Sequence, residues 1–71
     1  MEQVEIKLRE EYIKLGQALK AAGVAESGVD AKYMIQDGEV LVNGAVETQR
    51  GKKLYDGDQV RCGDVLIEIK A

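Results

Sequence analysis

The sequence contains no histidine, proline, phenylalanine or tryptophan, and it has a single cysteine among 71 residues. Without histidine the usual proton shuttle near neutral pH is missing, and most zinc sites are excluded. The lone Cys62 permits no internal disulfide and no CxxC metal motif. Its neighbours Val60 and Val65 indicate a packing role rather than a nucleophilic one. The composition therefore argues against an enzyme and a metalloprotein, and predicts no cofactor.

Long apolar runs are also missing. No stretch approaches the length of a membrane span, and the acidic, alternating start MEQVEIKLREE differs from a signal peptide. These features predict a soluble, cytoplasmic protein without membrane contact. Hydrophobic residues make up 45% and charged residues 32%, interleaved in the manner of a folded chain rather than a disordered one. The length allows one domain, which we expect to cover residues 1–71 as a monomer.

Hydrophobic periodicity predicts an N-terminal strand followed by two helices. Residues 4–8 alternate between apolar and charged side chains, the period of a half-buried strand. Residues 15–23 have helical spacing and end on a glycine, a common helix terminator. Ser27 and Asp30 form a capping box that opens a second helix, and Gly38 ends it. The short connection GVAE predicts that the two helices pack as a hairpin.

After the helices the period returns to two. Asn43-Gly44 is the strongest hairpin signal, with 45–48 as the return strand, and residues 59–62 and 65–69 form a second hairpin. We therefore predict an α+β fold in which a two-helix hairpin packs on a small, mostly antiparallel sheet, built as a four-stranded β meander. The N-terminal strand is expected to pair with the C-terminal strand, because both have the same alternating character.

Two motifs resemble ligand sites but fit them poorly. Asp56 and Asp58 flank a glycine, which is typical of a turn, whereas a hard cation needs about six oxygen ligands. The segment 44–53 begins with glycine and contains Gly-Lys, as a phosphate loop does. Its spacer is too long, and Lys53 stands where serine or threonine should bind magnesium. Neither a metal site nor a nucleotide site of this type is predicted.

Positive charge is concentrated in one segment. The net charge is -3, yet Arg50, Lys52 and Lys53 fall within four positions, and residues 49–54 contain no acid. One interpretation is a solvated connection whose cations keep the strand edges soluble. The other is phosphate binding. In that case the Arg50 guanidinium binds two oxygens of a phosphate, the lysines act as point charges, and Gly51 allows the backbone to approach the phosphate closely. Charge alone does not decide between them.

The order of short motifs along the chain favours the second interpretation, phosphate binding. Each motif is a weak signal alone, and the four together, in this order and spacing, are a strong one. The matching positions are Leu15, Leu19 and Gly23; Ser27, Ala31 and Lys32; Gly38, Val40, Val42, Asn43 and Gly44; and Gly57 and Asp58. This core motif, residues 14–60, resembles the RNA-binding domain first recognised in small-subunit ribosomal protein S-four, also called the αL motif. It is most similar to small stand-alone bacterial members of the YaaA/YbcJ type.

The resemblance implies a non-catalytic, ribosome-associated module that binds structured RNA, chiefly ribosomal RNA or a ribosomal particle. In that family the recognition surface is formed by the two helices and the adjoining β loop. Carried over position by position, it implies five RNA-binding residues, which are Lys14, Lys32, Arg50, Lys52 and Lys53. The alternative is a protein-interaction module that docks a partner through its acidic ends or an exposed sheet edge.

Overall fold

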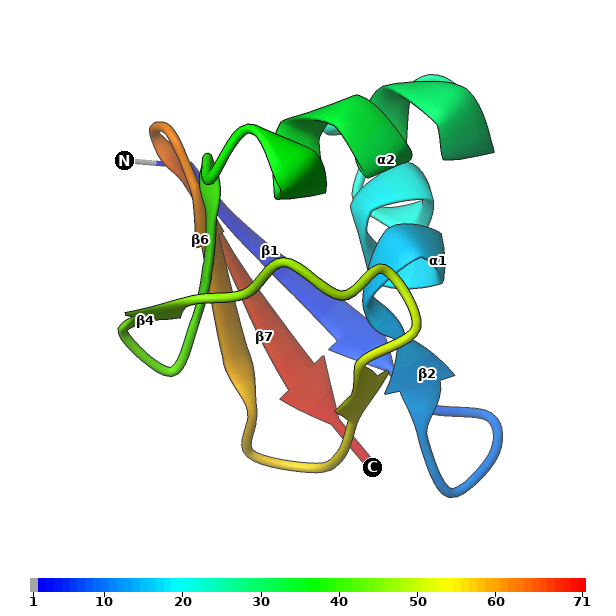
Figure 1. Ribbon diagram of the computed structural model, residues 1–71. Helices are drawn as coiled ribbons and strands as arrows, with labels where there is room; N and C mark the ends of the chain where they lie inside the picture. The colour runs from blue at the N-terminus through cyan, green and yellow to red at the C-terminus, as the bar shows by residue number, and fades with distance from the viewer. Residues whose placement is uncertain (1) are drawn as a thin grey trace.

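A computed structural model describes residues 2–71 and contains two helices and seven strands. Five strands form one sheet in the order β1-β7-β6-β3-β4, and β2 and β5 form a separate two-stranded ribbon (Figure 1). In chain order the elements are β1 (Glu2–Lys7), β2 (Ile13–Lys14), α1 (Leu15–Ala21), α2 (Gly28–Gln36), β3 (Val40–Val42), β4 (Ala45–Val46), β5 (Lys53–Leu54), β6 (Gln59–Cys62) and β7 (Val65–Lys70).

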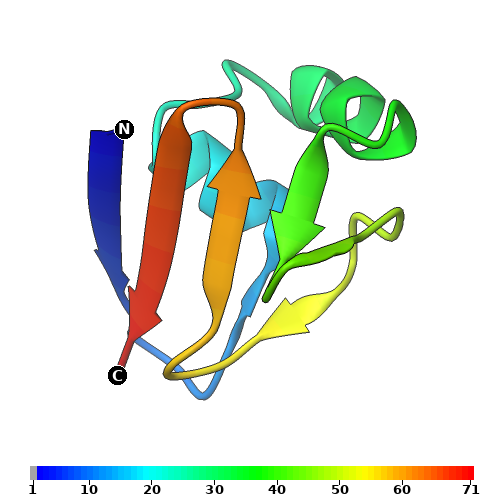
Figure 2. The ribbon, with the colours of Figure 1, turned by 90° about the vertical axis from the view of Figure 1, so that its left-hand side faces the viewer.

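The predicted fold class is confirmed. The two helices pack against one face of the sheet, while the other face, here called the outer face, is open (Figure 2). Strand β1 pairs with β7 in parallel, from Glu2 opposite Val65 to Lys7 opposite Lys70. The remaining pairs in the sheet are antiparallel. The predicted contact between the first and last strands is therefore present, and it closes one side of the sheet.

The predicted β meander is wrong, and so is the length of its second strand. Strand β4 ends at Val46 rather than at Thr48, and β6 pairs with β3 instead of β4. The Asn43-Gly44 turn forms as predicted, with φ values of 51° and 87° that suit a tight hairpin. After Val46, however, the chain leaves the sheet and crosses toward α1. The free edge of β3 is then filled by β6, which places β4 at the edge.

The helix ends follow the predicted signals. The Ser27 hydroxyl accepts a hydrogen bond from the Asp30 amide at 3.2 Å, so Ser27 caps α2. Gly23 and Gly38 lie just beyond α1 and α2 with φ of 77° and 78°, the left-handed conformation that glycine adopts without strain. No helix in the described part of the chain is long and apolar enough to cross a membrane.

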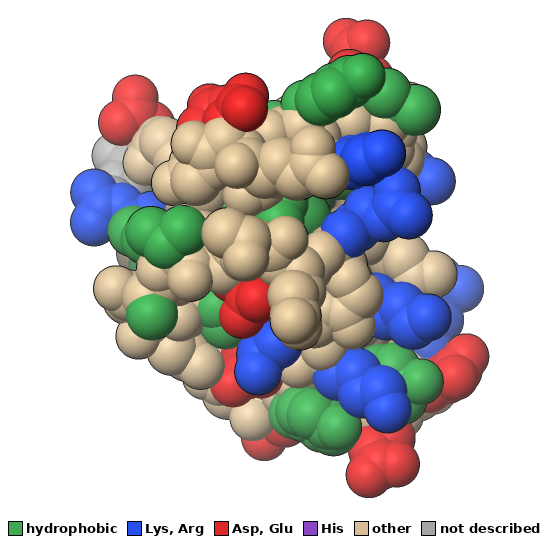
Figure 3. Space-filling model, viewed as in Figure 1, with side chains coloured by type: hydrophobic (Ala, Val, Ile, Leu, Met, Phe, Trp, Pro, Cys, Tyr) green, Lys and Arg blue, Asp and Glu red, His purple; other side chains and the backbone are tan. Residues whose placement is uncertain are grey.

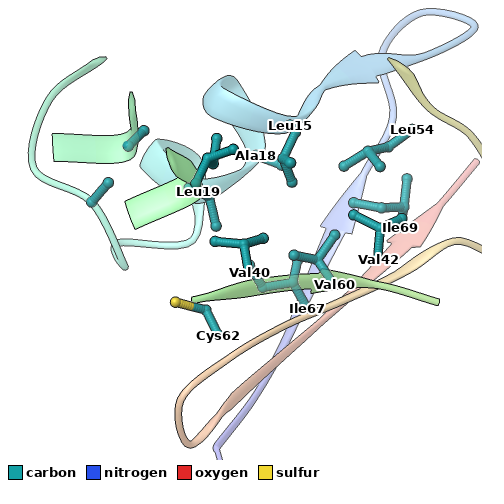
Figure 4. Packing of buried hydrophobic residues seen from close by; sticks show 13 residues of the cluster. Leu15, Ala18, Leu19, Val40, Val42, Leu54, Val60, Cys62, Ile67 and Ile69 are labelled. Atoms are coloured by element: carbon teal, nitrogen blue, oxygen red, sulfur yellow. The ribbon is translucent and has the colours of Figure 1, made fainter. Parts of the chain in front are cut away.

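The core is aliphatic and lies between the helices and the inner face of the sheet. Side chains of α1 point toward those of β3, β6 and β7 (Figure 4). Each fully buried Leu, Ile or Val stabilises the fold by roughly 1.5–3 kcal/mol relative to exposure. The buried hydrophobic residues are Leu15, Ala18, Leu19, Ala25, Ala31, Ile35, Val40, Val42, Leu54, Val60, Cys62, Ile67 and Ile69.

Cys62 belongs to this core, as its neighbours predicted. Burial raises the pKa of the Cys62 thiol above its ordinary value, and the negative charge of Glu39 raises the pKa further. The thiol is therefore protonated at neutral pH, whereas a nucleophilic cysteine needs the thiolate. Cys62 packs as a small apolar side chain.

Candidate nucleic-acid interface

Residues 47–53, here called the basic loop, are fastened to the start of α1 by backbone hydrogen bonds. The Leu15 amide donates to the Lys52 carbonyl at 2.8 Å, and the Gly16 amide donates to the Arg50 carbonyl at 3.1 Å. Within residues 2–71 no side chain caps α1, so the loop carbonyls satisfy amides that a capping side chain would otherwise serve. The start of the helix and the conformation of the loop therefore depend on each other.

A glycine lets the basic loop approach this closely. Gly16 is buried, and a Cβ atom added there would lie 2.7 Å from Cγ of Arg50 and 3.3 Å from its Cδ. The aliphatic part of Arg50 thus lies directly over the first turn of α1. Any larger residue at position 16 would displace the Arg50 side chain.

An open cavity of about 320 Å³ lies beside this contact, between α1, the start of α2 and the basic loop. Three cationic residues from separate parts of the chain line it, and none of the described lining residues carries a carboxylate. Gly28, the first residue of α2, brings the positive end of that nine-residue helix to the same place. The lining residues are Lys14, Gly16, Gln17, Lys20, Gly28, Arg50 and Gly51.

The positive charge continues from the cavity onto the β2–β5 ribbon. Lys14 and Lys53 stand directly opposite each other in the antiparallel register. Like charges in this arrangement destabilise a ribbon, and a bound anion would remove the repulsion. Figure 3 shows Lys and Arg side chains gathered along the side of the molecule that carries the helices, the basic loop and the ribbon.

The structure places the five predicted RNA-binding residues as follows. Lys14 and Arg50 line the cavity, and Lys53 lies across the ribbon from Lys14. Lys52 is exposed in the basic loop, with its carbonyl bonded to α1. Lys32 is exposed on α2, one turn beyond Gly28 and on the same side of the helix. Their part in RNA binding stays a prediction.

The sequence interpretation missed Lys20 and Gly16. Both line the cavity, and they are four residues apart on α1, so they share one face of the helix. Their common face could have been predicted from this spacing, because the sequence already predicts the helix. The docking of the basic loop on α1 could not be predicted from the sequence, because it depends on hydrogen bonds to backbone carbonyls, which every type of residue has.

A hydrogen-bonded network joins the two ends of the segment that contains the basic loop. The Asn43 side chain donates to the Asp58 carboxylate at 3.1 Å and accepts from the Gln59 amide at 2.9 Å. The same Asp58 carboxylate accepts from the Tyr55 amide at 2.8 Å. The Asn-Gly and Gly-Asp motifs are thus parts of one unit. The predicted turn at 56–58 is confirmed, since Gly57 has a φ of 92°.

Comparison with known proteins places these features in a family context. The family model of the S4 domain matches residues 6–70. The probable ribosome maturation protein RlbA of Bacillus subtilis is 49% identical over 55 residues, which is 78% of each chain. The putative RNA-binding protein YbcJ of Escherichia coli is 37% identical over 60 residues, covering 84% of this chain and 86% of YbcJ.

The fold is also similar to a solved structure. The solution structure of Escherichia coli YbcJ superposes with a TM-score of 0.71 at 32% identity. The match covers 100% of this chain and 89% of YbcJ, whose structure is described as revealing an αL motif involved in RNA-binding. The motifs that matched in the sequence therefore lie within a matching fold.

Proposed function

Because the chain belongs to the S4 domain family, we propose that it is a non-catalytic module that binds structured RNA, specifically ribosomal RNA or a ribosomal particle in the cytoplasm. The observation that carries the proposal is the cavity in which Lys14, Lys20 and Arg50 converge, with no acid among its described lining residues. The names of its relatives support it, since RlbA is a probable ribosome maturation protein and YbcJ a putative RNA-binding protein. The proposed interface, here called the basic face, consists of Lys14, Lys20, Lys32, Arg50, Lys52 and Lys53.

Backbone phosphates are the chemical groups that this face suits. Arg50 presents a planar fork for two phosphate oxygens, while Lys14 in β2 and Lys20 in α1 add mobile point charges. The hydrogen bonds from α1 hold the basic loop in place before RNA arrives, so little entropy is lost on binding. Contacts of this kind follow the shape of an RNA helix rather than its base sequence.

The proposal predicts binding that weakens steeply with salt. Each phosphate neutralised by a lysine or arginine contributes about 0.7–0.9 to the slope of log affinity against log salt concentration. Fluorescence anisotropy with a structured ribosomal RNA fragment, titrated at several salt concentrations, measures that slope. DNA of matched sequence and length is the control, and we expect RNA to bind more tightly. Absence of RNA binding at low salt would instead favour the protein-interaction alternative.

Substituting Gly16 with alanine tests whether Arg50 must lie over α1. Alanine favours a helix over glycine by up to about 1 kcal/mol, so we expect the melting temperature to stay level or rise. The new methyl group displaces Arg50, however, and RNA affinity is expected to fall about fivefold with the loss of one charged contact.

Gln36→Ala is the control, because Gln36 is exposed at the end of α2 and does not line the cavity. Both its stability and its RNA affinity should resemble wild type. Equal affinity of Gly16→Ala and wild type would contradict the role assigned to the Arg50 position.

A further inference from the structure

The β2–β5 ribbon carries an aromatic pair next to its lysine pair. In the register, Ile13 lies opposite Leu54 and Lys14 opposite Lys53. Because side chains alternate along a strand and Leu54 is fully buried, the lysines point outward. Tyr12 and Tyr55 come one residue beyond Ile13 and Leu54, and their ring centroids lie 6.0 Å apart.

The outward side of the ribbon therefore consists of a lysine rung followed by a tyrosine rung. Tyr12 lies two positions before Lys14 and Tyr55 two positions after Lys53, a spacing of about 6.7 Å in an extended chain. The lysine rung adjoins the cavity through Lys14. In Figure 3 hydrophobic side chains lie among those of Lys and Arg on the part of the surface over β2 and β5. A phosphate site and an aromatic surface thus lie side by side.

Of the two tyrosines, Tyr55 is the more exposed. The Lys53 ammonium lies 4.9 Å from the centroid of the Tyr12 ring and covers it as a cation–π contact. Tyr55 is 44% exposed. Its backbone is fixed between the buried Leu54 and the hydrogen bond to Asp58. A packing role alone does not require an aromatic ring held at the surface, whereas a stacking partner does.

We propose that this ribbon binds an unpaired nucleotide, whose base stacks on Tyr55 while its flanking phosphates contact Lys14 and Lys53. This inference rests on the proposed function and specifies the class of RNA: a helix interrupted by a bulged or single-stranded nucleotide. In a continuous duplex the faces of the bases are covered by their neighbours, so no base could reach the tyrosine. An aromatic ring beside cations is the arrangement that holds a splayed-out base.

The test uses one RNA stem-loop in three forms: with a single bulged nucleotide, with the same bulge made abasic, and fully paired. The abasic form keeps the phosphates and removes only the base. Wild type should bind the bulged form about tenfold more tightly than the abasic form, because stacking of one base has that effect. Tyr55→Leu should remove this preference, and Tyr55→Trp should keep it.

Tyr33→Leu is the matched control, since Tyr33 is 59% exposed on α2, away from the ribbon. It should retain the preference of wild type. The inference is overturned if wild type binds the bulged and abasic forms equally, or if folded Tyr55→Leu keeps the preference. Should Tyr55→Leu not fold, loss of the preference in folded Tyr55→Trp would overturn it instead.

The outcomes also separate this inference from the proposed function. Equal, salt-dependent binding of all three RNAs would refute the stacking site and leave the basic face intact. Failure of all three to bind at low salt would refute both.

Discussion

Replacing Lys14, Lys20 and Arg50 together with glutamine is expected to lower RNA affinity about a hundredfold, as three phosphate contacts are lost. The melting temperature should change little, because all three side chains are exposed and the backbone bonds between α1 and the basic loop remain. The slope of log affinity against log salt should decrease by about 2–3 in magnitude. Anisotropy titrations across several salt concentrations measure both quantities.

The control for this variant is a second triple replacement that changes the net charge equally. Lys7, Arg61 and Lys70 also comprise two lysines and one arginine, and they lie on the outer face of the sheet. Lys70 forms an ion pair with Glu68 at 3.8 Å, which is exposed and adds little stability. Their replacement with glutamine should weaken binding by less than about threefold, because none of the three lines the cavity between α1, α2 and the basic loop, and exposed charges outside it are largely screened. Equal losses in the two variants would mean that net charge, rather than the basic face, determines affinity.

Leu54→Ala is expected to have the largest effect on stability. Leu54 is fully buried, and it anchors β5, a strand of only two residues, between the basic loop and Tyr55. Removing a buried leucine side chain costs about 2–5 kcal/mol, a large fraction of what stabilises a domain of this size. The free energy of unfolding in urea, monitored by circular dichroism, measures the loss.

The same substitution should weaken RNA binding, because β5 presents Lys53 and the end of the basic loop. Val46→Ala is the matched control, since Val46 is 56% exposed at the edge strand and its truncation should change stability by less than about 0.5 kcal/mol. If Leu54→Ala were as stable as wild type, the anchoring role of Leu54 would be wrong.

Much of the fold could be predicted because its signals are local. The Ser27 cap, the Asn43-Gly44 turn and the alternation in β1 and β7 each lie within a few residues, and all three predictions are confirmed. The strand order could not be predicted in the same way. It depends on where the chain goes after Val46, which is determined by backbone bonds to α1. Strands β2 and β5 have two residues each, too few for any period to appear.

The candidate site was predictable only in part. The family resemblance pointed to Lys14 and Arg50, and both line the cavity. Lys20 escaped prediction because its neighbour in space, Arg50, comes from a distant segment. The roles of Asn43 and Asp58 were likewise interpreted as two separate turns. The hydrogen bond between them depends on the pairing of β3 with β6, which no local sequence signal predicts.

The parallel pairing of β1 with β7 has a consequence for how this protein is made. Among the strands of the sheet, β1 comes first along the chain and its partner β7 comes last, so β1 must wait for β7 to be synthesised before the two can pair. Contacts so distant along the chain slow folding, because the long segment 8–64 must close into a loop before they form. The sheet is completed only after β7 has left the exit tunnel of the ribosome. The five-stranded sheet therefore cannot be complete until the last of its strands is free to pair with the first.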